Sequence, residues 1–187
     1  MSMLFEAGLY RYHIRKPGFS AAEMQAFILN TDKALFPFLS LHSHYTLASG
    51  YGPGGVHLPS YIKNKDEACT QFRAEEKIIS TSFHHPSEVR KEAGRYEYAF
   101  LSPFYPSISK PGYRPSFAHE EVIPLLQDTA LNSRLFALGG IDEGHIEEIA
   151  AMGFGGAALS GAIWNAPSPA EKFKTMIALC RQLNHTY

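Results

Sequence analysis

The sequence predicts an α/β protein built as a TIM-type (β/α) barrel, in a single domain that spans residues 1–187. Short apolar runs rich in strand-forming residues alternate with longer segments of helical period, which is the pattern of parallel βα units. A chain of 187 residues with 45% apolar and 19% charged residues suits one hydrophobic core. A doubly wound open sheet shows the same alternation and is the structural alternative.

Seven segments are predicted strands, one fewer than the eight of a closed barrel. They are residues 8–14, 36–42, 54–58, 77–82, 96–102, 134–140 and 155–160. Residues 4–8 (LFEAG) resemble the end of a helix. We therefore expect that the first strand of the barrel is lacking and that this strand and most of its helix would precede Met1.

Predicted helices follow six of the seven strands, and local signals mark several of their ends. Ser20 and Glu23 form a capping-box pattern at the first helix. Asp142 can cap, and Gly153 can end, the helix between the last two strands. The expected segments are a helix from about residue 20, residues 45–50, 86–94, 119–130 and 142–152, and a final amphipathic helix ending near residue 183.

Composition predicts a cytoplasmic protein whose ligands are small molecules. The formal net charge of −1 gives no broad field that would attract nucleic acid or a membrane surface. The two cysteines are too few for a disulfide framework, which fits a reducing compartment. The N-terminal residues lack the apolar core of a signal peptide, and no apolar run approaches the roughly 20 residues that span a bilayer. An exposed barrel edge would allow a homodimer.

Two glycine-rich segments near the C-terminus, LFALGGID and GFGGAALSGAIW, predict a phosphate site. Glycine at the junction of a strand and a helix lets backbone N–H groups approach an anion closely. In barrels a phosphate site is often built from the loops after the last two strands and a short extra helix. The residues expected at these places are Gly139, Gly140, Gly156, Ser160 and Gly161. Each glycine alone indicates only a tight turn, whereas the pair of consecutive loops favours phosphate binding.

A second candidate anion site lies in the loop after the fifth strand. Ser107, Ser109 and Lys110 fall within four residues of one another. The hydroxyl groups can donate hydrogen bonds, and the lysine can act as a point charge. Because the loop follows a strand, it belongs to the ligand-binding end of either architecture.

Five histidines fall at or just past the C-terminal ends of predicted strands: His13, His42, His44, His57 and His84. His42 and His44, with a third histidine, could bind a transition metal through their imidazole nitrogens. Alternatively, His84 could act as a general acid and base. No carboxylate accompanies these histidines, which disfavours the metal hypothesis. His57 is expected to be a hydrogen-bonded, partly buried histidine.

The order of these motifs resembles the thiamine phosphate synthase/TenI family of (β/α)8 barrels over residues 4–164. The motifs are HIRKP, GGVHL, STSFHHPSE, FLSPFYPSISKPG, ALGGID and GFGGAALSGAIW. The synthase of this family joins a pyrimidine diphosphate to a thiazole phosphate and releases pyrophosphate with the help of magnesium. The TenI proteins catalyse a proton shift that aromatises a carboxylated thiazole phosphate.

The resemblance implies a role for each candidate site. The thiazole phosphate would bind Gly140, Gly156 and the backbone of residues 160–161. Residues 107–110 match the family's T-x-T-K loop, which contacts pyrophosphate and the thiazole carboxylate. Arg15 matches the arginine of a Q-L-R-x-K strand end, with His13 in place of the glutamine and Pro17 in place of the lysine.

The departures from the family pattern favour tautomerase chemistry. The N-D-R pattern of the synthase is replaced by residues 42–44 (HSH), and its H-x-G-Q-x-D pattern by residues 57–62 (HLPSYI), so both magnesium-binding aspartates are absent. Ser82 and His84 match the S-x-H position of the TenI proton-transfer histidine. Lys110 and Arg15 would orient the carboxylate.

Three alternatives remain open on the sequence. The first is true synthase activity, with magnesium held through the substrate pyrophosphate. The second is a barrel that keeps the phosphate site and has lost catalysis. The third is a histidine-ligated metal enzyme. Magnesium would be the cofactor of the first alternative and a transition metal that of the third; no other cofactor is expected.

Overall fold

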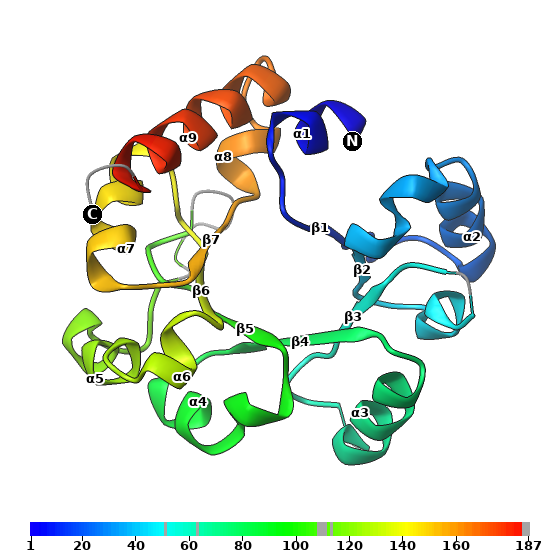
Figure 1. Ribbon diagram of the computed structural model, residues 1–187, viewed down its shortest axis with the longest axis horizontal. Helices are drawn as coiled ribbons and strands as arrows, with labels where there is room; N and C mark the ends of the chain where they lie inside the picture. The colour runs from blue at the N-terminus through cyan, green and yellow to red at the C-terminus, as the bar shows by residue number, and fades with distance from the viewer. Residues whose placement is uncertain (51, 63, 108–111, 113, 185–187) are drawn as a thin grey trace.

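The protein is a seven-stranded parallel sheet that curves into an open barrel with its helices on the outside (Figure 1). The computed structural model describes residues 1–50, 52–62, 64–107, 112 and 114–184. The strands are hydrogen-bonded in sequence order: β1 (Tyr12–Ile14), β2 (Leu39–Leu41), β3 (Gly55–His57), β4 (Ile78–Phe83), β5 (Tyr98–Leu101), β6 (Leu135–Leu138) and β7 (Gly156–Ala158). The predicted TIM-type barrel with seven strands is confirmed, and the doubly wound alternative is wrong, because that fold requires a reversal of strand order.

α-Helices lie between and beyond the strands. They are α1 (Ser2–Ala7), α2 (Ala21–Leu29), α3 (Lys65–Ala74), α4 (Pro86–Glu92), α5 (Ile123–Leu126), α6 (Thr129–Asn132), α7 (Ile146–Met152), α8 (Gly161–Trp164) and α9 (Pro169–Asn184). Short 3-10 turns are η1 (Lys33–Phe38), η2 (Tyr45–Ala48), η3 (Ala93–Arg95), η4 (His119–Glu121) and η5 (Glu143–His145). No helix in the described ranges is both long and apolar enough to cross a membrane.

Local capping explains where several helices begin and end. The Ser20 hydroxyl accepts from the Glu23 backbone, and the Glu23 carboxylate accepts from the Ser20 backbone, which confirms the predicted capping box at α2. Asp142 accepts from the Gly144 backbone at the start of η5, and α7 ends at Gly153 in the left-handed conformation, with φ of 90°.

The structure corrects two expectations about helices. Helix α3 lies between β3 and β4, where none is predicted; only Cys69 and Phe72 are buried on it, so its apolar pattern is sparse. The helix predicted at residues 119–130 is broken into η4, α5 and α6. Pro124 lacks a backbone N–H and is tolerated only in the first turn of α5, and Asp128 caps a new helix at Ala130.

The sheet has two faces of different chemistry. One face is apolar and packs under the surrounding helices; its buried residues include Ile14, Leu41, Val56, Ile79 and Leu101. Because successive strand residues point to opposite faces, the residues between them face the inside of the barrel. The two edge strands, β1 and β7, flank the region occupied by α1, α8 and α9, which pack against one another (Figure 1).

Candidate functional site

The inside of the barrel is lined by polar and aromatic side chains rather than by the branched aliphatic residues that usually fill it. His13 on β1 contacts Tyr98 and Phe100 on β5, with ring centroids 5.9 and 5.0 Å apart. The Tyr98 hydroxyl and His13 Nε2 are joined by a hydrogen bond of 2.7 Å. Since β1 and β5 are not neighbours in the sheet, these contacts cross the barrel interior.

Three histidines from three adjacent strands meet in this interior, and we call His13, His42 and His57 the histidine cluster. Leu41 pairs with Val56, which brings the next residues, His42 and His57, level with each other. Their rings stack with centroids 4.2 Å apart and an interplanar angle of 19°. His13 Nδ1 lies 2.9 Å from His42 Nε2.

His44 does not belong to the histidine cluster, so the prediction that His42 and His44 share one site is wrong. The chain leaves the sheet after β2, and His44 adopts a left-handed conformation with φ of 53° at the start of η2. Its Nε2–H donates to the Phe19 carbonyl oxygen at 2.8 Å. The two-residue spacing therefore no longer places both side chains on one face.

Burial keeps the histidine cluster uncharged. It lowers the pKa of His13 and of His57 well below the usual range, because an imidazolium there would lose its water shell. Burial, with a further contribution from the positive charge of Arg15, lowers the pKa of His42 to about 4. Arg15 itself is exposed and follows β1 directly, so it lies at the C-terminal mouth of the barrel beside the cluster.

His57 is buried and hydrogen-bonded, as expected. Its Nδ1 lies 3.0 Å from the Ser80 hydroxyl and its Nε2 lies 3.1 Å from the Ser82 hydroxyl. Sequence reasoning missed Ser80 and Tyr98 as parts of this interior. The available signal was strand alternation, because Ser80 and Ser82 share a face of β4.

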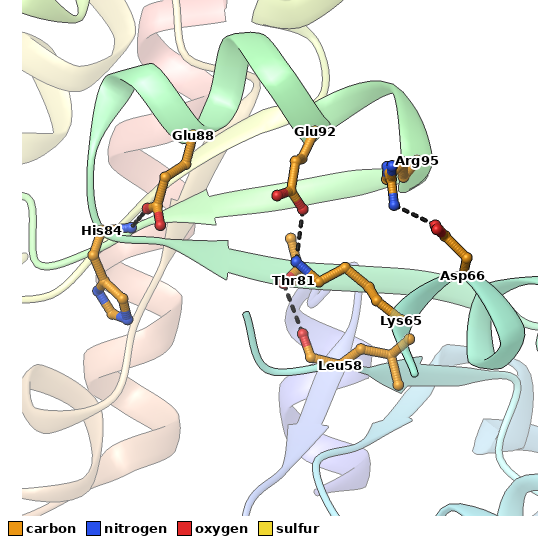
Figure 2. A network of polar contacts seen from close by, with 8 residues as sticks. All are labelled: Leu58, Lys65, Asp66, Thr81, His84, Glu88, Glu92 and Arg95. Atoms are coloured by element: carbon orange, nitrogen blue, oxygen red, sulfur yellow. Dashed lines mark hydrogen bonds and ion pairs between the residues drawn. The ribbon is translucent and has the colours of Figure 1, made fainter. Parts of the chain in front are cut away.

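His84 lies at the mouth of the barrel, directly after β4, and its side chain is exposed. Its Nδ1–H donates to the Ser102 carbonyl oxygen at 2.6 Å. A carbonyl oxygen can only accept, so the proton of the neutral imidazole is on Nδ1 and Nε2 carries a lone pair. Glu88 accepts from the backbone N–H groups of His84 (2.8 Å) and His85 (3.0 Å), which holds this turn at the start of α4 (Figure 2).

The first predicted glycine loop packs tightly against the loop after β5. Gly139 and Gly140 have φ of 99° and 71°, in the left-handed region. A Cβ on Gly140 would lie 2.4 Å from the Pro106 carbonyl oxygen, so a side chain is excluded. The Gly139 carbonyl oxygen accepts from the Tyr105 backbone at 3.0 Å. The structure therefore brings these two loops together, as the phosphate hypothesis requires, and Ser107 directly follows the contact.

The second predicted glycine loop is only partly where it was expected. Gly156 lies inside β7, level with Phe136, rather than in the loop after the strand; a Cβ there would lie 2.9 Å from the Phe136 ring. The assignment of Gly156 to the phosphate loop is wrong, because Gly156 is the first residue of the strand predicted at residues 155–160. Ser160 and Gly161 do follow β7: Ser160 is exposed, and Gly161 begins the short helix α8.

Two further candidates, Ser109 and Lys110, lie outside the described residues.

A hollow between α3 and α4 is not a suitable alternative phosphate site. It is lined by Ser60, Tyr61, Lys65, Phe83, Glu88 and Glu92. Lys65 pairs with Glu92 at 2.6 Å, so this hollow has a compensated cation and excess acid, which disfavours phosphate (Figure 2).

Sequence comparison with known proteins identifies one family. The model of the family described as thiamine monophosphate synthase matches residues 2–163. A thiamine-phosphate synthase of Bacteroides fragilis is 29% identical over 182 residues, covering 94% of this chain and 89% of the relative. A thiamine-phosphate synthase of Listeria welshimeri is 26% identical over 132 residues, covering 70% of this chain and 62% of the relative.

Solved structures show the same fold. A thiamine phosphate pyrophosphorylase from Bacteroides thetaiotaomicron superposes with a TM-score of 0.75 and 26% identity, covering 96% of this chain and 88% of its own. One from Pyrococcus furiosus gives a TM-score of 0.79 over 97% of this chain and 87% of its own; at 16% identity it supports the fold alone.

The tight loop contact predicts that Gly140→Ala is more destabilising than the same change at a left-handed glycine with free space. We expect Gly140→Ala to lower the free energy of unfolding by about 2–4 kcal/mol, from left-handed strain plus collision with backbone. Gly50, with φ of 64°, is the matched control, because a Cβ there would meet no atom within 4 Å beyond its chain neighbours; about 1 kcal/mol is expected. Urea denaturation measures both; equal losses would contradict the loop packing.

The buried histidines predict acid sensitivity. Between pH 6.5 and 4 the unfolded chain binds a proton at position 42 that the folded protein does not, so stability falls as the pH falls through this window. The pKa of about 4 corresponds to roughly 3 kcal/mol lost by pH 4. The unfolding free energy of His42→Gln should depend less steeply on pH. If the unfolding free energies of the two proteins had the same slope against pH, protonation of His42 would not be the cause of the acid sensitivity.

Proposed function

The chain belongs to the thiamine monophosphate synthase/TenI family, and from this premise we propose that it is a thiazole tautomerase acting on a carboxylated thiazole phosphate. In this proposal His84 moves a proton between two positions of the thiazole ring. The loops at the barrel mouth hold the phosphate and carboxylate groups. The enzyme would act in thiamine biosynthesis.

The hydrogen bond between His84 Nδ1 and the Ser102 carbonyl oxygen carries this proposal. It fixes both the ring and its tautomer, so that Nε2 presents a lone pair at the exposed mouth. A general base needs such a lone pair within reach of the proton that it abstracts. Once protonated on Nε2, the ring is an imidazolium that can return the proton to the second ring position, and the cycle leaves no net change on the enzyme.

Substrate anions would be held by groups around the same mouth. The contact between the turn at Gly140 and Pro106 supports a phosphate site shared by these two loops, to which Ser160 and Gly161 after the neighbouring strand β7 would contribute. Arg15 lies at the mouth beside the histidine cluster, where it can pair with the carboxylate. Lys110 is the second proposed carboxylate partner. Positioning of this kind supplies much of the rate enhancement in a proton-transfer enzyme.

Magnesium, which the family's synthase reaction uses, does not fit the residues of this chain. It prefers oxygen ligands in octahedral geometry. Residues 42–44 and 57–62 contain no carboxylate, and the described side chains that converge there are imidazoles. We therefore derive no step through magnesium, and the absence of both acids supports a reaction without a diphosphate leaving group.

Synthase activity is the second candidate, because the curated relatives that match most of this chain are named thiamine-phosphate synthases. An assay of both thiazole tautomers, with and without the pyrimidine diphosphate and magnesium, separates the candidates. Isomerisation without the pyrimidine supports the tautomerase. Magnesium-dependent coupling supports the synthase, and calorimetric binding of thiazole phosphate without either reaction indicates a barrel that has lost catalysis.

Replacement of His84 tests the proposed base. His84→Asn keeps an N–H donor for the Ser102 carbonyl and removes the basic nitrogen, so we expect kcat for isomerisation to fall at least 100-fold. Affinity for the thiazole phosphate should change less than about threefold, which calorimetry measures.

His85→Asn is the matched control, because His85 is an adjacent exposed histidine whose backbone N–H makes the same contact with Glu88. Its turnover should stay near that of the unmodified protein. Undiminished isomerisation by His84→Asn would remove the basis of the proposed mechanism.

A further inference from the structure

We propose that the histidine cluster is a binding site for a divalent transition metal such as Zn²⁺ or Co²⁺, with one ring nitrogen each from His13, His42 and His57 as ligands. This inference does not rest on the proposed tautomerase activity. It concerns the barrel interior, whereas His84 lies at the mouth and takes no part in the cluster.

The spacing of the nitrogens carries the proposal. One ring nitrogen from each histidine lies within 4.8 Å of the other two, and the closest pair, His13 Nδ1 and His42 Nε2, is 2.9 Å apart. Ligands about 2.0–2.1 Å from a tetrahedral Zn²⁺ lie roughly 3.3 Å from each other. The observed spacings therefore bracket the required one, and the proposal requires the side chains to rotate until all three nitrogens point at one ion.

The three ligands come from rigid positions. His13 and His57 belong to β1 and β3, and the backbone N–H of His42 donates to the Ile14 carbonyl oxygen at 3.2 Å, which extends the sheet by one residue. The Tyr45 hydroxyl lies 3.0 Å from the carbonyl oxygens of both His42 and His57 and shares its one proton between them. A site on adjacent strands is more sharply positioned than one on loops.

The surrounding hydrogen bonds orient the rings as metal ligands require. With Nδ1 of His13 on the metal, its Nε2 carries the proton and donates it to the Tyr98 oxygen, 2.7 Å away. Ser80 donates to the Val56 carbonyl oxygen and can accept from Nδ1 of His57, which leaves Nε2 of His57 with its lone pair. Metal binding would replace the contact of that nitrogen with Ser82 and the hydrogen bond between His13 Nδ1 and His42 Nε2, with the His42 proton moving to its Nδ1.

The donor set selects the class of metal. Three neutral imidazoles suit Zn²⁺, Co²⁺, Ni²⁺ or Cu²⁺, whereas Mg²⁺ and Ca²⁺ require oxygen. Three protein ligands leave a fourth position open. Arg15 adds positive charge beside the cluster and opposes a bare dication, so a small anionic oxygen ligand is expected at that position.

Metal titration of the purified, chelator-treated full chain tests the proposal. We expect one Zn²⁺ or Co²⁺ per chain by calorimetry and elemental analysis, with the visible absorption of tetrahedral Co²⁺, and no binding of Mg²⁺ at the same concentrations. His13→Gln and His42→Gln should each weaken Zn²⁺ binding at least 100-fold. His44→Gln is the matched control, since His44 is two residues from His42 but bonds to the Phe19 carbonyl; its affinity should be unchanged.

Tyr98→Phe removes the hydrogen bond that orients His13 while keeping the ring, and it should weaken Zn²⁺ binding 10- to 100-fold. Circular dichroism confirms that each variant is folded. The proposal is overturned if the unmodified protein binds neither Zn²⁺ nor Co²⁺, or if folded His13→Gln and His42→Gln bind Zn²⁺ as tightly as it does. These titrations measure metal binding and not turnover, so their outcome is independent of the isomerisation assay that tests the tautomerase hypothesis.

Discussion

The rest of the structure depends on the curvature of the sheet, and the hydrogen bond between Tyr98 and His13 shows this curvature. These residues lie on β5 and β1, yet their polar atoms are 2.7 Å apart. Such a contact requires the sheet to curve until its distant strands face each other across one interior. The same curvature forces every alternate strand residue into a shared, restricted space. Polar groups buried there must satisfy one another, and the histidines, serines and tyrosine do so.

The outer face of the sheet stabilises the fold, and the inner face holds the polar groups. Apolar residues such as Leu41 and Ile79 point outwards, are fully buried under the helices and stabilise the barrel. Because this outer core stabilises the barrel, the interior does not need to be filled with aliphatic side chains and can hold histidine, serine and tyrosine. The C-terminal mouth adds groups that the interior lacks: an exposed basic nitrogen on His84, the positive charge of Arg15, and loops drawn together at Gly140.

The side chains at these strand ends decide what the barrel can bind, because Ser43 and Ile62 stand where the synthase patterns have aspartate and the groups that converge are imidazoles. Carboxylates at the ends of these strands would offer hard oxygen ligands to magnesium, whereas imidazoles offer nitrogen ligands to softer metals. The proton-transfer and metal-binding proposals use separate histidines, since His84 is tied to the Ser102 carbonyl and the cluster is tied to Tyr98, Ser80 and Ser82. One fold can in this way support different chemistry in its interior and at its mouth.

The sequence by itself determined the parallel βα architecture, the capping of α2 by Ser20 and the position of His84 after β4, because these depend on residues close together in the chain. Only the tertiary structure decided which histidines meet. His42 and His44 are neighbours in sequence, but the chain turns after β2 and separates them. His13 is 29 residues from His42, and the pairing of β1 with β2 joins them. Helix α3 was also missed, because its few buried residues give little periodic signal.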